Sequence, residues 1–578
     1  MKNLRNIFVL GLLAFALKPV CVYGFINNVL PEKTEDEILV NQLGYYPWSP
    51  KVALLKVRST KFEIVEVKSG KTVFTGTPGP FRYWEYSGDS VSVVDFSDFK
   101  ELGDFQIRLI DKSIVSLPFS IGPSIYADIA KASIKAFYLN RTGIALSEEF
   151  AGKWARPAGH PDTMVFIHAS ASSSLRPEGS ILKSPGGWYD AGDYNKYIVN
   201  SAITTYTLLL FYQLYPDYCK SLNINIPESS NAIPDVLDEL LENIRWMLTM
   251  QDPADGGVYH KLTNKTFCDF VMPHQATDAR YVVAKSTAAS LDFAATMAMA
   301  YRVLAQEESK ELQQLAKHCL QAAHKAYLWA KQNPDNYYIN PIDISTGAYD
   351  DKVLEDEFFW AECELGLAED NMKLLALVGI EKQKPLVQSW DYVSMLGIAS
   401  LALSKNPDAK TYSARAQQVL IGYVDKLIQK STDSPFNISL DFFKWGSNSD
   451  VANMAMLKII AHNLTHNQKY FNALQSDVDY LLGRNATTYC FVTGFGQKRV
   501  MNIHHRPSGA DGIEEPCPGF LVGGPITVVL NDCPSVQRST KPAKSFVDLL
   551  CSYSTNEIAI NWNAPLFFVL GTLDSVSK

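Results

Sequence analysis

Two aspartates lie close together in a stretch of small and aromatic residues. Asp190 and Asp193 are separated only by Ala191 and Gly192. These two small residues allow a tight turn that brings both carboxylates to one side and lets a substrate approach the backbone. Neighbouring carboxylates resist simultaneous ionisation, and such a pair can hold a water molecule and remove its proton. Calcium ligation and capping of the following helix remain alternative interpretations.

Further candidate groups lie near the C-terminal end. Glu557 follows the run Tyr-Ser-Thr-Asn and precedes an apolar segment. Taken alone, it is as well explained by a first-turn glutamate that the helix dipole favours. His504, His505 and Arg506 form a basic cluster in the preceding loop, where they can bind sugar hydroxyls or hold a carboxylate ionised. Metal binding by the two histidines lacks a nearby third ligand.

A separate acidic cluster precedes a segment with a helical pattern. Asp351, Asp356 and Glu357 are its candidate metal ligands. Hard oxygen donors at this density suit Ca²⁺. A solvated helix start is the alternative interpretation.

The elements that must position these groups begin with a short β-rich region. Alternating apolar residues at 51–57, 62–67, 90–95 and 105–110 are bounded by Gly, Pro and Ser-Gly turns. This period-two pattern predicts a small antiparallel β-sandwich over residues 37–122.

From residue 123 to 578 the apolar spacing becomes helical, and almost no strand pattern is visible. About a dozen helices in one unit predict paired inner and outer rings, an (α/α)6 toroid, since no fixed-period repeat supports a solenoid. The long connections 154–194 and 487–545 are rich in Trp, Tyr, Asp and His, and functional groups are expected there. The expected helices span 125–146, 195–214, 233–250, 287–304, 311–331, 354–367, 393–403, 412–429, 451–464, 470–482 and 559–573.

Composition excludes some partners. The 578-residue chain has a net charge of −8 with both signs interspersed, and no basic stripe suggests nucleic-acid binding. Aromatic residues make up 12% of the chain; they can fill a core or form flat platforms for sugars.

The first residues have the pattern of a targeting segment. Lys2 and Arg5 precede a short apolar run, so residues 1–24 are predicted to be a signal peptide and the protein to be secreted, periplasmic or extracellular. A lipid anchor at Cys21 is the less favoured alternative, because the residues before it match a lipoprotein cleavage box poorly. No other stretch is apolar enough to span a membrane.

Eight further cysteines have irregular spacing and no CxxC pair. This pattern supports neither a zinc cluster nor a dense disulfide framework. Most are expected to be buried thiols, with one or two disulfides left open.

Taken together, the motifs resemble glycoside hydrolase family 9, the inverting cellulases. The family's base motif stands here as Gly-Trp-Tyr-Asp-Ala-Gly-Asp over residues 187–193. Its acid signature is met from 546 to 564, and its His-x-Arg signature by 504–506. Cys490 is a mild departure, since that pattern prefers Ser, Thr or Val there. The run Val-Asn-Gln-Leu-Gly-Tyr over residues 40–45 resembles the start of the immunoglobulin-like module that precedes one branch of the family.

The resemblance implies a role for each matching residue. Asp193 matches the general base, Asp190 the residue that helps hold the nucleophilic water, and Glu557 the general acid. His504 and Arg506 match residues that contact the sugar next to the cleaved bond. Inversion requires the acid and the base to be roughly 6.5–9.5 Å apart, so that water fits between base and sugar.

The resemblance also implies secondary sites. The Asp356-Glu357 pair resembles the family's structural calcium site, to which Asp351 could add a ligand; no cofactor is expected for catalysis. Some relatives carry a zinc site of Cys and His, but residues 141–160 contain no Cys, and no zinc is expected. Four aromatic residues are candidate stacking platforms or cleft walls, with core packing as the alternative for each: Trp188, Tyr194, Trp445 and Trp562.

The expected function is therefore hydrolysis of β-1,4-glucosidic bonds in cellulose, mixed-linkage glucan or xyloglucan, and the protein is expected to be a monomer. An exo-acting or xyloglucan-specific member and a non-catalytic glucan-binding homologue are the alternatives. A polysaccharide lyase on a similar toroid would need a Tyr or His base and a neutraliser for uronate carboxylates.

Overall fold

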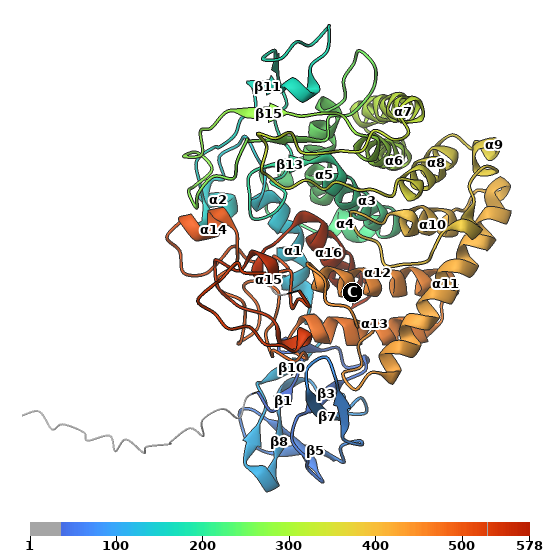
Figure 1. The fold of residues 1–578 in the computed structure, drawn as a ribbon. Coiled ribbons are helices and arrows are strands. Elements are labelled where there is room, and N and C mark those ends of the chain that lie inside the picture. Colours follow the sequence, from blue (N-terminus) through green and yellow to red (C-terminus); the bar gives the residue numbers. More distant parts are fainter. Residues whose placement is uncertain (1–35, 529, 578) are drawn as a thin grey trace, which may run out of the picture.

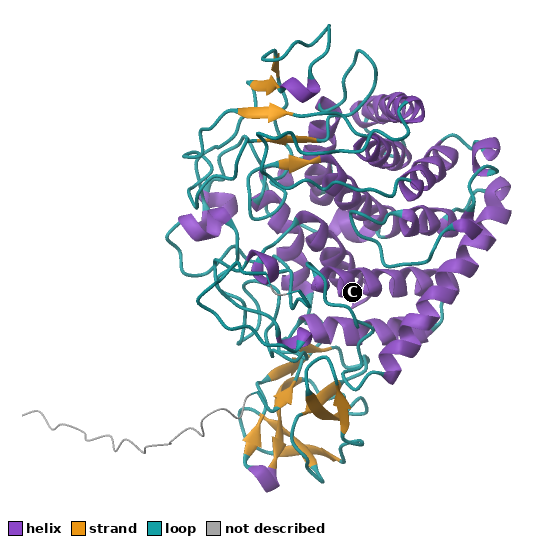
Figure 2. Ribbon diagram, viewed as in Figure 1, coloured by secondary structure: helices purple, strands orange, loops and turns teal. Residues whose placement is uncertain are grey.

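The computed structural model describes residues 36–528 and 530–577 (Figure 1). The expected signal peptide and Cys21 lie outside these residues. A β-sandwich packs beneath a larger helical domain, and Figure 2 shows most strands in the sandwich and a few in the helical domain.

The sandwich consists of two sheets with strand orders β1-β3-β7-β6 and β2-β10-β8-β4-β5, and β9 pairs with β8. The period-two pattern is clear in β8, where Phe105, Ile107 and Leu109 are buried between more exposed neighbours. The strands are β1 Ile38–Leu39, β2 Gly44–Tyr45, β3 Val52–Leu55, β4 Phe62–Glu66, β5 Thr72–Gly76, β6 Arg82–Trp84, β7 Asp89–Asp95, β8 Gly103–Leu109, β9 Ile114–Val115 and β10 Phe119–Ile121.

Six apolar helices form a closed inner ring in the helical domain. Each contacts the next in the order α3, α6, α8, α10, α12 and α16, and α16 contacts α3. Residues 198–212 of α3 are all buried, because an inner helix is covered on every side. The inner helices are α3 Ile198–Leu214, α6 Thr287–Leu304, α8 Glu355–Ala368, α10 Ser394–Leu403, α12 Ser447–Thr465 and α16 Ile560–Ser577.

A second ring covers the first. Each outer helix packs mainly on one inner helix: α1 on α16, α5 on α3, α7 on α6, α9 on α8, α11 on α10 and α13 on α12. These helices bury one face; in α7 the buried positions Leu312, Ala316, Cys319 and Ala323 recur every three or four residues. They are α1 Ala127–Leu139, α5 Asp235–Thr249, α7 Lys310–Gln332, α9 Met372–Leu375, α11 Lys410–Asp433 and α13 Gln468–Leu481. The predicted sandwich followed by an (α/α)6 toroid is confirmed.

The helical domain also contains a short sheet that the sequence pattern does not reveal. Five short strands form a sheet of order β12-β11-β15-β14-β13 in the long connections. They hold two or three residues each, too few for a period-two pattern to emerge. The strands are β11 Val165–Ile167, β12 Ile181–Leu182, β13 Lys196–Tyr197, β14 Lys261–Thr263 and β15 Arg280–Val282, and the remaining helices are α2 Glu148–Ala151, α4 Pro216–Ser221, α14 Arg506–Ala510 and α15 Tyr553–Asn556.

One disulfide, Cys533–Cys551, closes a loop before α15, and the other cysteines within the described residues are free thiols. None of the described helices has the length and apolar character needed to cross a bilayer.

The sandwich and the toroid share a buried interface. Trp84 stacks on Phe436 with ring centroids 4.2 Å apart. The Gln42 side chain accepts hydrogen bonds from the backbone N–H groups of Gln497 and Lys498, each at 2.9 Å, and donates to the carbonyl oxygen of Thr488 at 2.7 Å. Gln42 thus satisfies three backbone groups of a loop in the helical domain.

We expect Gln42→Ala to destabilise the protein by about 2–3 kcal/mol, because it leaves buried backbone donors and an acceptor without partners. The measurement is the midpoint of urea unfolding. Gln429→Ala, at an exposed position of α11, is the control and should change stability by less than about 0.5 kcal/mol. Equal midpoints for both variants would contradict this account of the interface.

Candidate active site

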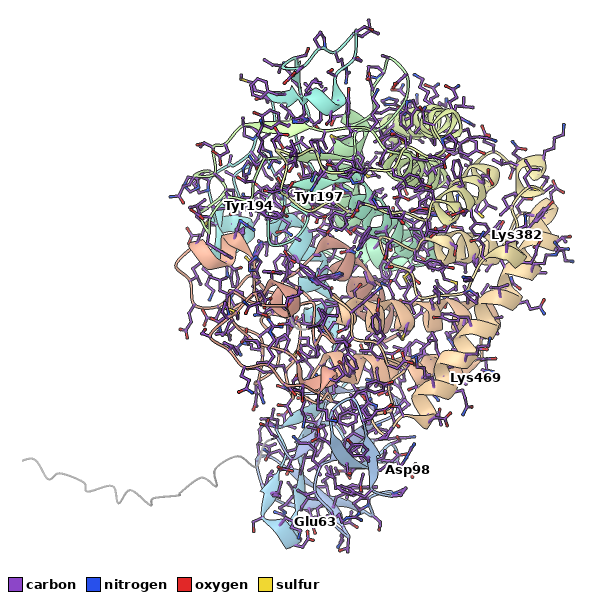
Figure 3. All side chains as sticks on the ribbon, in the orientation of Figure 1. Glu63, Asp98, Tyr194, Tyr197, Lys382 and Lys469 are labelled. Carbon is purple, nitrogen blue, oxygen red and sulfur yellow. A yellow bond between two sulfur atoms is a disulfide. The ribbon has the colours of Figure 1, made fainter. Side chains whose placement is uncertain are left out.

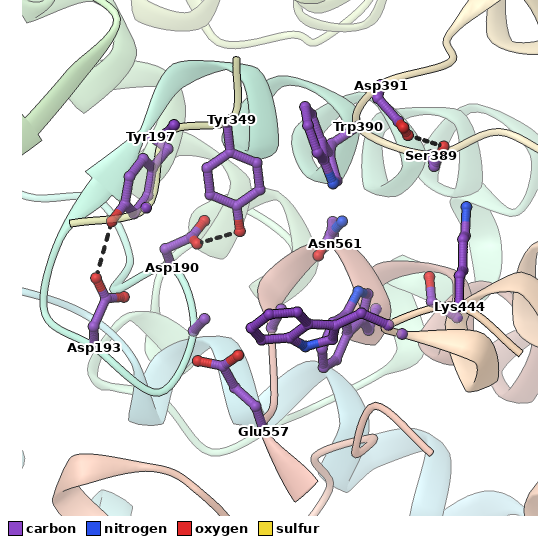
Figure 4. A pocket seen from close by; sticks show the side chains of 18 of the residues that line it. Asp190, Asp193, Tyr197, Tyr349, Ser389, Trp390, Asp391, Lys444, Glu557 and Asn561 are labelled. Atoms are coloured by element: carbon purple, nitrogen blue, oxygen red, sulfur yellow. Dashed lines mark hydrogen bonds between the residues drawn. The ribbon is translucent and has the colours of Figure 1, made fainter. Parts of the chain in front are cut away.

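A cavity of about 430 Å³ lies at one mouth of the toroid (Figure 4). Residues at or just before the N-terminal ends of α3, α10, α12 and α16 line it, together with residues 347–349 of the loop that precedes α8. Helix N-termini carry partial positive charge and favour anionic groups. Three of the lining residues with carboxyl groups are Asp190, Asp193 and Glu557.

The turn between the two aspartates is required by close packing. A Cβ on Gly192 would lie 2.3 Å from the carbonyl oxygen of His504 and 3.1 Å from Oε1 of Glu557. The backbone N–H of Gly192 donates to the same Oε1 at 3.3 Å. Gly192 therefore allows the segment that carries Glu557 to pack against the turn. This packing role comes in addition to the expected one of leaving room for the substrate.

The two aspartates have different hydrogen-bond partners. Asp190 accepts from Asn200 on Oδ1 at 2.6 Å and from the Tyr349 hydroxyl on Oδ2 at 2.7 Å. For Asp193, Asn195 at 2.5 Å and the Tyr197 hydroxyl at 3.0 Å both donate to Oδ2. Figure 4 shows the two tyrosine contacts as dashed lines.

Neither aspartate caps α3. Tyr197 occupies the N-cap position of this helix. Since Asp193 instead faces the cavity, the capping interpretation does not hold.

Glu557 is fixed by backbone contacts on both sides. It lies between α15 and α16, and Gly523 N–H donates to its carbonyl oxygen at 2.9 Å. The adjoining carbonyl of Asn556 accepts from His504 N–H at 2.8 Å. Because α16 begins only at Ile560, Glu557 is not a first-turn residue of that helix.

The surroundings of Asp190 and Glu557 raise the pKa values of both carboxyl groups. Burial raises the pKa of Asp190, and the charge of Asp193 raises it further. Burial also raises the pKa of Glu557 well above its ordinary value, as do the charges of Asp193 and Asp190. A protonated Glu557 can donate a proton at neutral pH.

The basic pair supports the walls of the site. Arg506 donates to the carbonyl oxygens of Gly192 at 2.8 Å and Cys268 at 2.9 Å. The Nδ1 atom of His504 bonds the carbonyl oxygen of Leu550 at 2.7 Å. Both residues lie beside the Asp190/Asp193 turn and outside the residues that line the cavity, so sugar contact by them stays a prediction.

The four predicted aromatic residues separate into two groups. Trp445 and Trp562 line the cavity. Trp188 and Tyr194 do not, and their prediction as cleft walls is wrong: the indole N–H of Trp188 donates to Glu239 at 2.7 Å, and the Tyr194 hydroxyl donates to the carbonyl oxygen of Val271 at 2.7 Å. Both are buried, in agreement with the core-packing alternative.

Sequence analysis missed several lining residues. Tyr349 lies in the segment interpreted only as an acidic cluster, and its place two residues before Asp351 gave no sign of contact with Asp190. Phe267 and Trp390 also line the cavity. They lie in loops, and an aromatic residue between predicted helices was the signal that could have found them.

The acidic cluster is buried near the N-terminus of α8. Asp351, Asp356 and Glu357 are joined by Asp292 of α6, which the sequence analysis missed because it lies inside an apolar helix. Both carboxylate oxygens of Asp292 and of Glu357 are without hydrogen-bond partners. Burial and then neighbouring carboxylates raise the pKa of both residues. In the part of the chain that the structure describes, no three His, Cys, Asp or Glu side chains form a group that could hold a metal ion as arranged.

Comparison with known proteins identifies relatives over the whole fold. The model of "Glycosyl hydrolase family 9" matches residues 126–570, and that of "Cellulase N-terminal ig-like domain" matches residues 33–113. The chain is 39% identical to a xyloglucan-specific endo-beta-1,4-glucanase of Bacteroides ovatus, over 100% of this chain and 99% of that protein. It is 32% identical to Endoglucanase D of Acetivibrio thermocellus, over 93% of this chain and 83% of that protein.

Solved structures agree. A family 9 protein of Bacteroides ovatus superposes with a TM-score of 0.86 at 38% identity, covering 94% of this chain and 100% of that one. A thermostable endoglucanase of Alicyclobacillus acidocaldarius superposes with a TM-score of 0.83 at 30% identity, covering 93% and 99%. The family predicted from the sequence motifs is confirmed: the chain belongs to glycosyl hydrolase family 9 and is a glycoside hydrolase with an N-terminal immunoglobulin-like domain.

Proposed function

We propose that the protein is an endo-acting glucanase that hydrolyses β-1,4-glucosidic bonds with inversion, with Asp193 as base, Asp190 as its partner and Glu557 as acid. One observation carries the proposal: these three carboxyl groups, from opposite ends of the helical domain, line a single cavity. Inversion needs a base that activates water on one face of the sugar and an acid that protonates the leaving oxygen on the other.

Hydrogen bonding favours Asp193 as the base. Both oxygens of Asp190 accept side-chain donors, one each. The two side-chain donors that reach Asp193 share Oδ2. Oδ1 of Asp193 is then the carboxylate oxygen with capacity to bind and deprotonate a water molecule.

The environment of Glu557 favours the acid role. Its pKa is raised well above the ordinary value by burial and by the charges of Asp193 and Asp190, which favours the protonated form that a general acid needs. A general acid works only while it holds its proton, so activity is expected to fall as pH rises through this pKa. The Gly192 N–H orients Oε1 toward the Asp190/Asp193 turn.

Substrates with different leaving groups distinguish the proposed acid role of Glu557 from the proposed base role of Asp193. Glu557→Gln should lose about 10²- to 10⁴-fold in kcat on a polysaccharide but little on an aryl β-cellobioside whose phenolate leaves without protonation. Asp193→Asn should lose activity on both substrates, because water activation is needed for each. Reducing-sugar and phenolate release are the measurements. Full polysaccharide turnover by either variant would contradict the assignment.

Xyloglucan is the proposed preferred substrate. The support is the 39% identity, over the full chain, with a relative whose name specifies xyloglucan. The cavity is also bordered by the indoles of Trp390, Trp445 and Trp562, and aromatic faces of this kind suit sugar rings.

We expect kcat/KM on tamarind xyloglucan to exceed that on barley β-glucan and carboxymethylcellulose by at least about tenfold, the ratio that 1.4 kcal/mol of differential transition-state binding gives. Endo action should release oligosaccharides of several lengths from the start of the reaction. Equal rates on all three polymers would remove the xyloglucan preference and leave the glucanase proposal intact.

A structural Ca²⁺ is proposed at the acidic cluster. Asp292, Asp351, Asp356 and Glu357 offer only hard oxygen donors, as Ca²⁺ requires. Buried carboxylates without partners are costly unless they are protonated or meet a cation. Binding requires these side chains to draw together around the ion, since they do not form a ready-made group.

If Ca²⁺ binds, EDTA treatment should lower the Tm and added Ca²⁺ should restore it, because an ion that binds only the folded state stabilises it. Asp292→Asn should abolish this response, while Asp343→Asn, an exposed carboxylate elsewhere, should retain it. If neither EDTA nor Ca²⁺ changes the Tm, and Asp292→Asn is more stable than the original protein, the carboxyl groups are instead protonated.

Export to an oxidising compartment is supported by the Cys533–Cys551 disulfide, since such bonds persist outside the cytosol. The N-terminal pattern of residues 1–24 is the second support. One copy of the chain supplies all three carboxyl groups, in agreement with a monomeric enzyme.

A further inference from the structure

A buried lysine lies behind the Asp190/Asp193 turn. Lys261 of β14 is the antiparallel partner of Tyr197 on β13. Its side chain is fully buried, as is that of Tyr197 apart from 2% of its surface. Figure 3 labels Tyr197 in the interior of the helical domain. The five-stranded sheet that the sequence pattern did not reveal is what sets these two residues opposite each other.

The ammonium group of Lys261 contacts only neutral acceptors. Nζ donates to Asn340 Oδ1 at 2.8 Å, Thr346 Oγ1 at 3.0 Å and the Gly347 carbonyl oxygen at 2.6 Å. Of the other fully buried lysines in the described chain, Lys196 is paired with Asp162 and Lys458 with Asp477. Lys51, in the sandwich, bonds only backbone carbonyl oxygens. None of the ion pairs among the described residues includes Lys261, although buried lysines are seldom unpaired.

The anionic partner of Lys261 lies across an aromatic ring. Nζ is 5.5 Å from the centroid of the Tyr197 ring, and the Tyr197 hydroxyl donates to Asp193 Oδ2 at 3.0 Å. A cation over the face of a phenol draws electron density from the ring, and the hydroxyl becomes a stronger donor. Burial lowers the pKa of Lys261 to about 7, and the charge of Asp193 acts in the opposite direction.

The same ammonium holds the segment that carries Tyr349. Thr346 and Gly347, two of its acceptors, come just before Tyr349, whose hydroxyl bonds Asp190. A Cβ on Gly347 would lie 3.2 Å from the Tyr197 hydroxyl oxygen, so this segment packs directly on the phenol. Figure 4 shows Tyr197 and Tyr349 next to each other, each bonded to one aspartate.

Negative charge surrounds Asp193 on its other sides. Asp190 and Glu557 face it across the cavity. The basic residues near Asp193 are Arg506 and His504. The Arg506 guanidinium is bonded to backbone carbonyl oxygens, and the pKa of His504 is lowered chiefly by burial. The Lys261 ammonium is therefore a further positive group close to the Asp190/Asp193 pair.

We propose that Lys261 is a positioning residue of the hydrolytic reaction: its ammonium strengthens the hydrogen bond that the Tyr197 hydroxyl donates to Asp193, and it anchors the segment of Tyr349 against Asp190. The inference rests on the proposed role of Asp193 as base. Lys261 itself touches neither water nor sugar.

The test is the pH dependence of kcat/KM for Lys261→Met and Lys261→Arg. The acid limb of this profile, the pH range over which kcat/KM rises with pH, reports ionisation of the coupled Asp190/Asp193 pair. Loss of a nearby cation disfavours the ionised form, so Lys261→Met should move this limb upward by about 0.5–1 pH unit. That is a three- to tenfold loss of kcat/KM on the acid side. Lys261→Arg keeps the charge and should keep the limb near its original position.

Two further variants keep the inference falsifiable. Tyr197→Phe retains the ammonium but removes the bond to Asp193, and it should shift the limb in the same direction; it decides the matter if Lys261→Met does not fold. Lys458→Met removes a buried lysine of α12 that bonds Asp477, and it should lower the Tm without moving the limb.

The outcomes are distinct for the two proposals. If the acid limb of Lys261→Met does not move while Asp193→Asn is inactive, the role of Lys261 alone is overturned. Where Lys261→Met does not fold, the acid limb of Tyr197→Phe is used in its place. An active Asp193→Asn would overturn the base assignment itself.

Discussion

The carboxyl groups of Asp190, Asp193 and Glu557 line one cavity, and the negative charges of their neighbours disfavour ionisation of Asp190 and Glu557. Burial and mutual repulsion raise the pKa values of Asp190 and Glu557. Such crowding is tolerated only where donors and positive dipoles surround it. Here hydroxyl and amide donors meet both aspartates, and the N-terminal ends of α3, α10, α12 and α16 border the cavity. The toroid thus supplies the electrostatic environment that the carboxylates need.

The scaffold also fixes distances between segments that are remote in sequence. Gly192 lets the Asp190/Asp193 turn touch the segment of His504 and Glu557, since a Cβ would collide with it. The loop that leads to His504 is in turn held by Gln42 of the sandwich through three backbone hydrogen bonds. The immunoglobulin-like domain therefore helps to support the side of the cavity that carries Glu557.

The sequence predicted the two rings of helices because their apolar spacing is long and regular. It could not reveal the five-stranded sheet, since strands of two or three residues carry no period. The Asp190/Asp193 pair was visible from spacing alone, whereas Glu557 was distinguished only by the surrounding family signature. Trp188 and Tyr194 belong to the same motif as the aspartates, yet they pack inward, because a motif does not fix the direction of each side chain. Asp292 and Lys261 interact with residues far along the chain, and a single sequence contains no trace of such pairings.

The Asp190/Asp193 pair and the cluster of Asp292 and Glu357 contain similar residues but differ in the donors around them. The side-chain partners of Asp190 and Asp193 are all neutral hydroxyl or amide groups, and the Lys261 ammonium lies behind the Tyr197 ring rather than against either carboxylate. Asp450, which also lines the cavity, is instead paired with Lys444. Direct contact with an ammonium would hold the base in a tight ion pair and compete with water for Oδ1. In the cluster of Asp292 and Glu357 the carboxylate oxygens have no donors, so their burial must be offset by protons or by a cation. The placement of donors, more than the number of carboxylates, therefore separates a site suited to proton transfer from one suited to holding an ion.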